Sequence, residues 1–328
     1  MAQTERISNR VKLQHLRVVR AVAECGSMAK AAKQLAVSQP VVSRVVSELE
    51  DLLKARLFDR SPQGVEPTLY GRALLARSIS IFDDIKAGID EILFLSDPTT
   101  GELRIGCTEP LFAGLVTTTM ERLWLQHPQI ALRTVQGDSA TLINRELLER
   151  RIEFAILPTQ PALFRADLEV TILYHDYWHV VVGSKNPWAR RRKVTLADLA
   201  NEPWCATPLD TATGSLLNEP FKACGLEPPR LAVTSVLSPQ LVVRLLASGR
   251  LVTVMADSLV NFFFANQFPI KILPIELAMK PFAIALVTVK NRTLSPLAQR
   301  FIDCAREVGV QLEAQRSKTV RKRVSLGN

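Results

Sequence analysis

Apolar side chains recur every three or four positions in three short segments at the start of the chain, which predicts three helices. Gly26 ends the first helix, Ser27 caps the second and Ser38 caps the third, with Pro40 in its first turn, where a missing amide hydrogen costs nothing. The apolar positions are Leu13, Leu16, Val19 and Ala23 in the first helix, Met28, Ala31, Ala32 and Leu35 in the second, and Val42, Val45, Val46 and Leu49 in the third.

The third helix is predicted to run to about Leu53, and it carries a short polar arc opposite its apolar stripe. At about 100° per residue, this arc holds a single positive charge, and Gln39 projects at its leading end. The members of the arc are Pro40, Ser43, Arg44 and Ser47.

The second and third helices, joined through Val37 and Ser38, fit a helix-turn-helix, in which the second of the two enters the DNA major groove by its N-terminal end. In that interpretation Gln39 and Arg44 face base edges or phosphates, and Pro40 faces a thymine methyl. Ser38 then pairs with a phosphate at the helix N-terminus. An ordinary three-helix bundle, in which Ser38 is only a cap, explains the same spacing.

A hairpin is predicted after the third helix, because residues 59–68 combine short extended runs with a turn that contains Gly64. Such a wing places Arg60 and Gln63 along the DNA backbone or in the minor groove. A plain surface hairpin is the alternative.

A long helix follows the hairpin, capped by Thr68 and reaching about Leu95. Its apolar residues take a/d-like places over nearly three heptads, with Ser78 as a polar interruption, and this face predicts dimerisation. Packing of the same face on its own domain is the alternative. Pro98 and Gly101 then end the helix in a linker. The a/d-like residues are Leu75, Phe82, Ile85, Ile89 and Ile92.

Strand and helix patterns alternate from Gly101 to about Leu312, which is typical of an α/β domain with a mainly parallel sheet. The predicted strands are residues 103–107, 130–136, 154–157, 178–182, a short one near 205, 231–233, 251–254 and 282–287. The predicted helices are residues 112–126, 140–150, 216–224, 240–247 and 297–310.

Composition supports a folded protein of more than one domain, because the chain has 328 residues, 47% of them hydrophobic and 22% charged. No apolar run reaches the roughly 18 residues of a membrane span. The first residues lack the apolar core of a secretion signal, so we expect a cytoplasmic protein without a membrane partner. The five cysteines are scattered, which predicts neither a disulfide framework nor a zinc site.

The net charge of +9 is concentrated in two runs that contain no acidic residue. Either run fits contact with nucleic acid, although a solvated loop or tail is the commoner explanation. The first run holds Lys185, Arg190, Arg191, Arg192 and Lys193, and the second holds Arg316, Lys318, Arg321, Lys322 and Arg323.

No pattern predicts catalysis, a metal or a cofactor. The common hydrolase and nucleotide-binding strings G-x-S-x-G, G-x-x-x-x-G-K-[ST] and G-x-G-x-x-G are missing. His175 and His179 have a metal-binding spacing for a helix, but residues 180–182 predict a strand, which would put the two about 13 Å apart. We therefore expect the chain not to be an enzyme.

Residues 13–73 closely resemble the winged helix-turn-helix of LysR-type transcriptional regulators. The resemblance is carried by Leu16–Ala23, Gly26–Ala32, Val37–Arg44, Glu48–Glu50, Leu57–Arg60 and Thr68–Arg72. It implies a bacterial factor that binds a partly dyad-symmetric promoter site on double-stranded DNA as a homodimer or homotetramer, responds to a small-molecule effector and acts with RNA polymerase. The implied DNA-binding residues are Ser38, Gln39, Pro40, Ser43, Arg44, Arg60 and Gln63.

The rest of the chain more loosely resembles the two-lobed, periplasmic-binding-protein-like effector domain of that family. The resemblance implies that a small, anionic metabolite binds between the lobes, where strand ends meet helix N-termini. Each implied residue also fits a plain cap or turn. Carried over position by position, the effector-binding residues are Thr108, Asp138, Ser139, Thr207, Pro208, Gly214, Ser215 and Ser238.

Two further features bear on this effector site. Arg151 stands where the family usually has glycine, and residues 252–255 lack its usual glycine and proline. Cys107 lies beside the expected cleft, where a thiol senses oxidants, although a buried apolar cysteine is the simpler interpretation.

The expected organisation is multidomain: an all-α winged helix-turn-helix at 1–68, a linker helix and hinge at 69–100, and the α/β effector domain at 101–312. Its lobes are expected to cross over near 180–184 and 280–290, and residues 313–328 are expected to form a disordered basic tail. A different hypothesis makes residues 101–312 a solute-binding protein or enzyme, with the first helices only a dimerisation cap.

Overall fold

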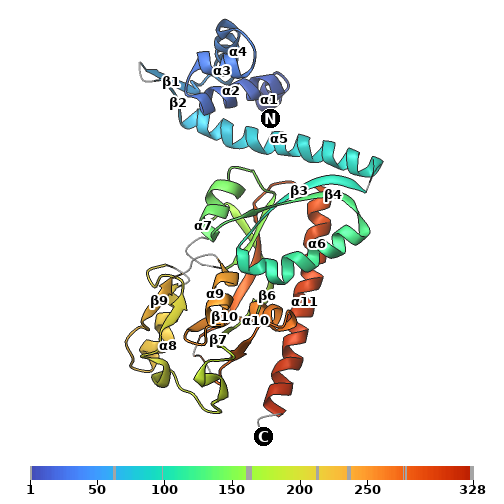
Figure 1. Ribbon diagram of the computed structural model, residues 1–328. Coiled ribbons are helices and arrows are strands. Elements are labelled where there is room, and N and C mark those ends of the chain that lie inside the picture. Colours follow the sequence, from blue (N-terminus) through green and yellow to red (C-terminus); the bar gives the residue numbers. More distant parts are fainter. Residues whose placement is uncertain are drawn as a thin grey trace. The chain divides into compact units, whose positions relative to one another are not determined.

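The computed structural model describes residues 2–61, 64–97, 99–159, 165–211, 214–234, 238–275, 277 and 279–325 (Figure 1). The chain forms two compact units. The smaller unit is Met1–Ile89 with Asn291–Thr293, and the larger unit is Asp90–Lys290 with Leu294–Asn328. Within the described ranges, no helix has both the length and the apolar composition that crossing a membrane requires.

The smaller unit begins with four helices, and the predicted apolar stripes of the last two are confirmed as part of its core. The stripe predicted for the helix before them is wrong at Leu13, which is 49% exposed, whereas Val18 and Val22 of that helix are buried. Gly26 ends the first of the predicted helices in the left-handed conformation at φ 60°, and the Ser27 hydroxyl accepts a hydrogen bond from the next helix. The helices are α1 (Ala2–Ser8), α2 (Leu13–Cys25), α3 (Met28–Gln34) and α4 (Gln39–Leu53).

The predicted hairpin and the long helix as far as Ile89 belong to this unit, and the last turns of the helix belong to the larger one. The strands β1 (Phe58–Ser61) and β2 (Gly64–Pro67) pair antiparallel, and α5 (Leu69–Ser96) follows them. Thr68 caps α5 as expected, because its hydroxyl accepts a hydrogen bond from the Gly71 amide at 3.1 Å. A side chain at Gly71 would lie 2.1 Å from the Leu57 carbonyl oxygen, so only glycine lets α5 start this close to the wing.

The larger unit contains two five-stranded sheets, each the centre of one lobe. In the first sheet the order is β4-β3-β5-β12-β6, with β3 parallel to β4 and β5, and β12 antiparallel to β5 and β6. The strands are β3 (Thr100–Cys107), β4 (Gln129–Gln136), β5 (Phe154–Pro158), β6 (Leu168–Asp176) and β12 (Phe282–Val289).

Helices cover both faces of the first sheet. On one face α6 (Leu115–Gln126) and α11 (Pro296–Ser325) share a core with β3, and on the other the α7 turn (Ser139–Thr141) continues into the π-helix η2 (Leu142–Leu147). A short 3₁₀ helix, η1 (Glu109–Ala113), joins β3 to α6. The ends of β3 and β4 therefore lead directly into helical turns, as the predicted strand–helix alternation requires.

The second sheet has the order β11-β7-β10-β8-β9, with β10 parallel to β8 and antiparallel to β7. Val180 and Val182 are buried on one face and Val181 on the other, which explains the uninterrupted valine run. The strands are β7 (Trp178–Gly183), β8 (Trp204–Ala206), β9 (Leu231–Thr234), β10 (Val252–Ala256) and β11 (Ile270–Ile272).

The helices of this second lobe are short. Two of them, α9 (Pro239–Leu246) and α10 (Asp257–Ala265), share one core with the sheet, and α8 (Asn218–Ala223) lies in the core of the other face (Figure 1). The 3₁₀ helices are η4 (Pro187–Arg190), η5 (Ala197–Leu199) and η6 (Gly214–Leu217).

The crossovers between the lobes differ from the sequence expectation. The first is at Tyr177, between β6 and β7, and the second lies between the end of β11 at Ile272 and the start of β12 at Phe282. The expected positions near 180–184 and 280–290 fall largely inside β7 and β12. An apolar run shows that a strand is buried, but it does not show at which end the chain changes sheets.

Helix α11 continues to Ser325 and so includes most of the residues 313–328 that the sequence assigned to a disordered tail. Residues 311–323 are mostly good helix formers, and the sequence has no proline or glycine between Val310 and Gly327, so nothing local ends the helix.

Candidate functional site

The N-terminal end of α4 presents a polar surface on a rigid base. The buried stripe of α4 includes Val42, Val46 and Leu49, which have no solvent exposure. On the opposite side Gln39 and Arg44 are exposed. The remaining residues of the predicted arc share this surface, where Pro40 and Ser47 are exposed and Ser43 is half-buried. This surface has the shape and polarity of a helix end that enters a groove.

Ser38 occupies the N-cap position of α4, but its hydroxyl makes no capping hydrogen bond. Its side chain is exposed, and only its backbone carbonyl bonds to the helix, accepting from the Val41 and Val42 amides at 3.1 and 3.3 Å. The predicted capping role is therefore wrong for the hydroxyl. That hydroxyl is exposed at the start of α4, where the helix dipole favours an oxyanion.

The wing is held to the helices by two contacts. The Glu50 carboxylate accepts hydrogen bonds from the Leu57 and Phe58 amides at 2.7 and 3.2 Å, and the Val65 amide donates to the Gly26 carbonyl at 2.9 Å. Arg60 is exposed and pairs with Val65 in the hairpin. Gln63 lies outside the described residues.

Glu50 belongs to the motif Glu48–Glu50 that the sequence singled out, yet its role became visible only in the structure. The carboxylate lies at the C-terminal part of α4 and fixes the start of β1. The wing and the α4 surface are consequently joined directly, by hydrogen bonds within the smaller unit.

The long helix α5 exposes an apolar stripe. Ile85, Ile89 and Ile92 are 37%, 53% and 65% exposed, whereas Leu75 and Phe82, from the same predicted stripe, are partly buried. The first turns of the stripe therefore pack on the chain itself. The later turns leave large aliphatic side chains in water, which is unfavourable for a monomer.

In the larger unit, Thr108 is the strongest of the predicted effector residues. It is the N-cap of η1, is 8% exposed, and makes no side-chain cap bond. Its Oγ1 is buried without a hydrogen-bond partner, although such groups are almost always satisfied in folded proteins. A hydroxyl in this state is suited to a ligand that brings a donor or an acceptor.

Asp138 and Ser139 follow β4, and their side chains differ in role. The Asp138 carboxylate caps α7 by accepting from the Thr141 amide at 2.9 Å and from its hydroxyl at 2.6 Å. The hydroxyl bond, followed by the amide bond, lowers the pKa of Asp138. Ser139 is buried at the start of α7. Thr108 and Ser139 thus stand at the ends of neighbouring parallel strands, β3 and β4.

The predicted residues of the second lobe take mainly structural roles. Ser238 caps α9, and the Pro208 carbonyl accepts from the amide and hydroxyl of Thr211. Gly214 is a close-packing position, because a side chain there would lie 2.0 Å from the Pro208 carbonyl oxygen. Thr207 is half-buried after β8, and Ser215 is exposed.

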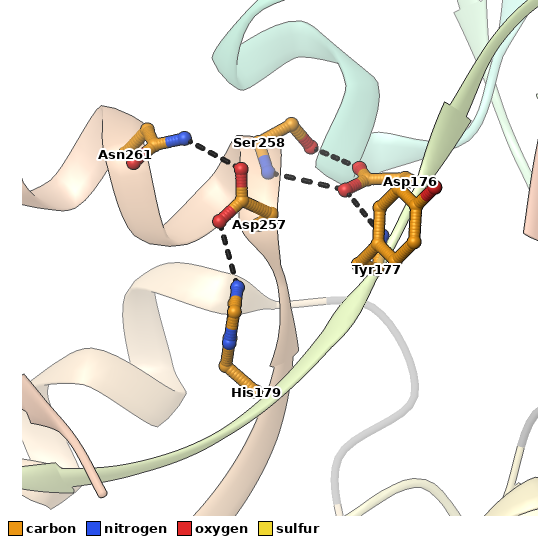
Figure 2. A network of polar contacts seen from close by, with 6 residues as sticks. All are labelled: Asp176, Tyr177, His179, Asp257, Ser258 and Asn261. Atoms are coloured by element: carbon orange, nitrogen blue, oxygen red, sulfur yellow. Dashed lines mark hydrogen bonds and ion pairs between the residues drawn. The ribbon is translucent and has the colours of Figure 1, made fainter. Parts of the chain in front are cut away.

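A polar network that the sequence did not indicate ties the first crossover to α10 (Figure 2). Asp176 is 3% exposed and accepts three hydrogen bonds: from the Tyr177 amide at 2.8 Å, and from the Ser258 amide and hydroxyl at 3.3 and 2.5 Å. Burial raises the pKa of this carboxyl. The contact joins the last residue of β6, in one lobe, to the first turn of α10, in the other.

Asp257 forms the second half of the network (Figure 2). One oxygen lies 2.7 Å from His179 Nε2, and the other accepts from Asn261 Nδ2 at 2.9 Å. The Asp257 amide donates to the Tyr177 carbonyl at 2.8 Å. His179 therefore contacts a carboxylate whose own amide is bonded to Tyr177, the residue at which the chain passes from one lobe to the other.

His175 also has a carboxylate neighbour, with its Nδ1 3.2 Å from Glu313. Among the described residues, no group of three histidine, cysteine or acidic side chains is arranged to hold a metal ion. Cys107 is fully buried, and burial, followed by the charge of Glu109, raises the pKa of its thiol well above the ordinary value. These surroundings fit a buried apolar cysteine and disfavour a reactive thiolate.

Two family models match the chain. The model described as LysR substrate binding domain matches residues 96–309, and the model described as bacterial regulatory helix-turn-helix protein, lysR family, matches residues 13–72. The chain is 27% identical over 291 residues to the HTH-type transcriptional regulator GbpR of Azospirillum brasilense, an alignment that covers 88% of this chain and 84% of GbpR. It is 28% identical over 299 residues to the transcriptional dual regulator GltC of Bacillus subtilis, covering 89% and 96% of the two chains.

Solved structures share the fold. Full-length CbnR in complex with its target DNA matches with a TM-score of 0.53 at 22% identity, covering 91% of this chain and 100% of that one. A full-length OxyR variant from Pseudomonas aeruginosa matches with a TM-score of 0.59 at 19% identity, covering 92% and 95%. The architecture of a helical DNA-binding unit, a linker helix and a two-sheet α/β domain is therefore common to these proteins.

Proposed function

The chain belongs to the LysR family of DNA-binding transcriptional regulators, and from that premise we propose that it binds a dyad-symmetric promoter site as a homodimer that pairs into a homotetramer. The observation that carries this proposal is the exposed polar end of α4, set on a core whose apolar stripe is fully buried. One helix end reads only half a site, so a second copy on the dyad is needed for useful specificity.

Each predicted contact has a chemical role in this proposal. Gln39 and Arg44 read base edges in the major groove, and Pro40 contacts a thymine methyl. Ser38 and Ser43 bond to phosphates, and the wing residues Arg60 and Gln63 follow the backbone or the minor groove. The free Ser38 hydroxyl and the exposed Arg60 side chain support these roles.

Dimerisation is assigned to α5. The exposed Ile85, Ile89 and Ile92 side chains form the stripe that a second copy covers in a coiled-coil-like contact. The same contact sets the distance between the two α4 helices. Half-sites in the bound DNA should accordingly lie about one helical turn, or a multiple of it, apart.

Footprinting of the DNA upstream of the encoding gene tests the DNA part of the proposal. We expect protection of two half-sites related by a dyad, with affinity falling steeply as salt rises because phosphate contacts release counterions. A single protected half-site, or affinity that is indifferent to salt, contradicts the proposal.

The effector is proposed to be a small, anionic metabolite that binds at the ends of β3 and β4. The buried, unpartnered Thr108 hydroxyl supports this site, with Ser139 beside it on the neighbouring strand end. The proposed contacts from the remaining turns are Asp138, Thr207, Pro208, Gly214, Ser215 and Ser238. Binding there changes how the subunits sit on DNA, because a ligand favours the arrangement to which it binds more tightly.

Thermal melting across a panel of small carboxylates, phosphates and neutral metabolites tests the effector part, since a ligand of the folded state raises the melting temperature. We expect Thr108→Val and Ser139→Ala to abolish the shift given by the active compound. The control, Thr117→Val, changes a hydroxyl that already donates to the Phe112 carbonyl and should keep the shift. Retention of the shift in both site variants would place the ligand elsewhere.

RNA polymerase is the proposed partner on the promoter, and the cytoplasm is the proposed location, because regulation of transcription requires both. Polymerase recruitment to the upstream DNA, measured with and without the regulator, tests this step. Recruitment that is the same in the two cases contradicts a direct role.

A further inference from the structure

Five exposed cations gather on one loop of the second lobe, after β7 and around η4. We call residues 185–193 the basic loop. Among the described residues, no ion pair joins any of these five side chains to a carboxylate. The Asp198 carboxylate already accepts two hydrogen bonds from Thr195, both at 2.8 Å. These bonds, and last the charge of Arg191, lower the pKa of Asp198. The five cations are Lys185, Arg190, Arg191, Arg192 and Lys193.

The backbone of the basic loop is fixed from inside. Asn186 is 2% exposed, its amide donates to the Gly183 carbonyl at 2.9 Å, and its side chain accepts from the Trp188 amide at 2.9 Å. The Trp188 indole donates to Glu202, also at 2.9 Å. A loop held in this way loses little backbone entropy when it binds a partner.

Buried residues also stand at both ends of the four consecutive cations. Ala189 precedes Arg190 and is buried, and Val194 follows Lys193 and is buried. The four cations between them are all exposed. Their charges are thus held close together on the surface, where they repel one another and where a polyanion relieves that repulsion.

The chemistry of the loop favours phosphate over a protein surface. Guanidinium groups bind phosphate oxygens through two parallel hydrogen bonds. Protein interfaces usually centre on exposed aromatic or aliphatic anchors. Among the described residues, the large exposed apolar side chains include none between Ile172 and Leu216, and Trp188 is half-buried with its indole N–H engaged.

We propose that the basic loop binds the phosphate backbone of duplex DNA outside the half-sites that α4 reads. The proposal rests on the DNA-binding function described above and adds a second, sequence-independent contact from the larger unit. Such contacts raise affinity for all sequences and make it depend more strongly on salt.

The test compares three full-length proteins on a random-sequence duplex of about 60 base pairs, with affinity measured by fluorescence anisotropy between about 50 and 200 mM salt. The loop variant combines Arg190→Gln, Arg191→Gln, Arg192→Gln and Lys193→Gln. The control removes the same charge from four other exposed cations of the larger unit and combines Lys222→Gln, Arg230→Gln, Lys280→Gln and Lys290→Gln.

Each lost phosphate contact reduces the slope of log affinity against log salt by about 0.9, so two to four contacts reduce it by about 2 to 4. Over the same salt range the unmodified chain should therefore lose about 10- to 150-fold more affinity than the loop variant. In the control variant the slope should differ from that of the unmodified chain by no more than about 0.9, the value of one phosphate contact. Circular dichroism and melting temperature should show that both variants are folded.

An unchanged slope in the loop variant overturns the proposal, and so does an equal reduction in both variants, which would indicate diffuse charge. A change of sedimentation in the loop variant at an unchanged slope would instead identify an acidic surface of a second copy as the partner. Failure of the DNA-binding function itself is distinguishable, because the unmodified chain would then not bind its upstream DNA.

Discussion

Replacing Asp176 by alanine should loosen the junction between the two lobes of the larger unit. The change removes one carboxylate that accepts three hydrogen bonds, two of them from the backbone amides of Tyr177 and Ser258 (Figure 2). Hydrogen bonds to a charged group contribute about 1.5 to 3 kcal/mol each, and relief of the buried charge offsets part of the loss. We expect a net cost of about 3 kcal/mol in the free energy of opening the junction.

Hydrogen exchange of the peptides that cover residues 174–180 and 255–262 measures this opening directly. A cost of about 3 kcal/mol corresponds to exchange roughly 100-fold faster in Asp176→Ala. The matched control Ser258→Ala removes only the hydroxyl donor, so it should cost about 1.5 kcal/mol and speed exchange about tenfold. Exchange in Asp176→Ala within a few-fold of the unmodified chain would refute the reasoning.

Three other changes test separate parts of the structure. Gly183→Ala should cost more than about 4 kcal/mol and prevent folding of the second lobe, because the new Cβ would lie 1.8 Å from the Leu246 carbonyl oxygen. Soluble yield and melting temperature measure this effect. Gly88→Ala is the control that should be tolerated, because its Cβ would meet no atom within 4 Å. Ile89→Asp should convert the dimer to a folded monomer in sedimentation, since this 53% exposed side chain lies on the proposed α5 interface; a dimer of unchanged stability would refute it. Because burial raises the pKa of Asp176 above its ordinary 3.8, the folded state holds that proton more tightly than the unfolded state, and the stability it contributes is lost as pH rises from about 3.8 through the folded pKa. Asp176→Asn should therefore flatten the dependence of unfolding free energy on pH above that value, and an identical profile would contradict the buried-carboxylate account.

The smaller unit was predictable because its signals are local. The stripe of α4, the capping position of Thr68 and the pairing of the two wing strands each depend on neighbours within a few residues, and the structure confirms them. The hydroxyl of Ser38 is the exception. Its N-cap position was correct, but whether a hydroxyl bonds to the helix or to solvent depends on a rotamer that sequence spacing does not fix.

The larger unit was less predictable where sheets join. Strand β6 was missed because its burial does not alternate: Leu173 and Tyr174 are both buried, next to a register shift between Ile284 and Ala285 of β12. Helix α10 was missed because a run of three phenylalanines has no helical period. The Asp176–Ser258 contact joins residues 82 positions apart, so no spacing in the sequence indicates it.

The predicted effector residues also differ in whether the sequence could indicate their role. Asp138 and Ser238 are helix caps, as their position before a helix also suggested, and Gly214 is required by close backbone packing. Thr108 differs because its environment, buried and without a partner, arises from the packing of η1 on the ends of the strands. The sequence shows that a hydroxyl stands before a helix, but only the fold shows whether that hydroxyl caps the helix or is available to a ligand.

The most direct measurement of the central claim compares Gln39→Ala with the unmodified chain on the upstream site and on random DNA of equal length. Gln39 is exposed, so the fold should be unaffected, and discrimination between the two duplexes should fall by about 1 to 3 kcal/mol while random binding stays constant. Glu48→Ala, nine residues along α4 and therefore about half a turn around the helix, is the control that should keep full discrimination. Equal weakening on both duplexes, or no change on either, would show that α4 does not read bases.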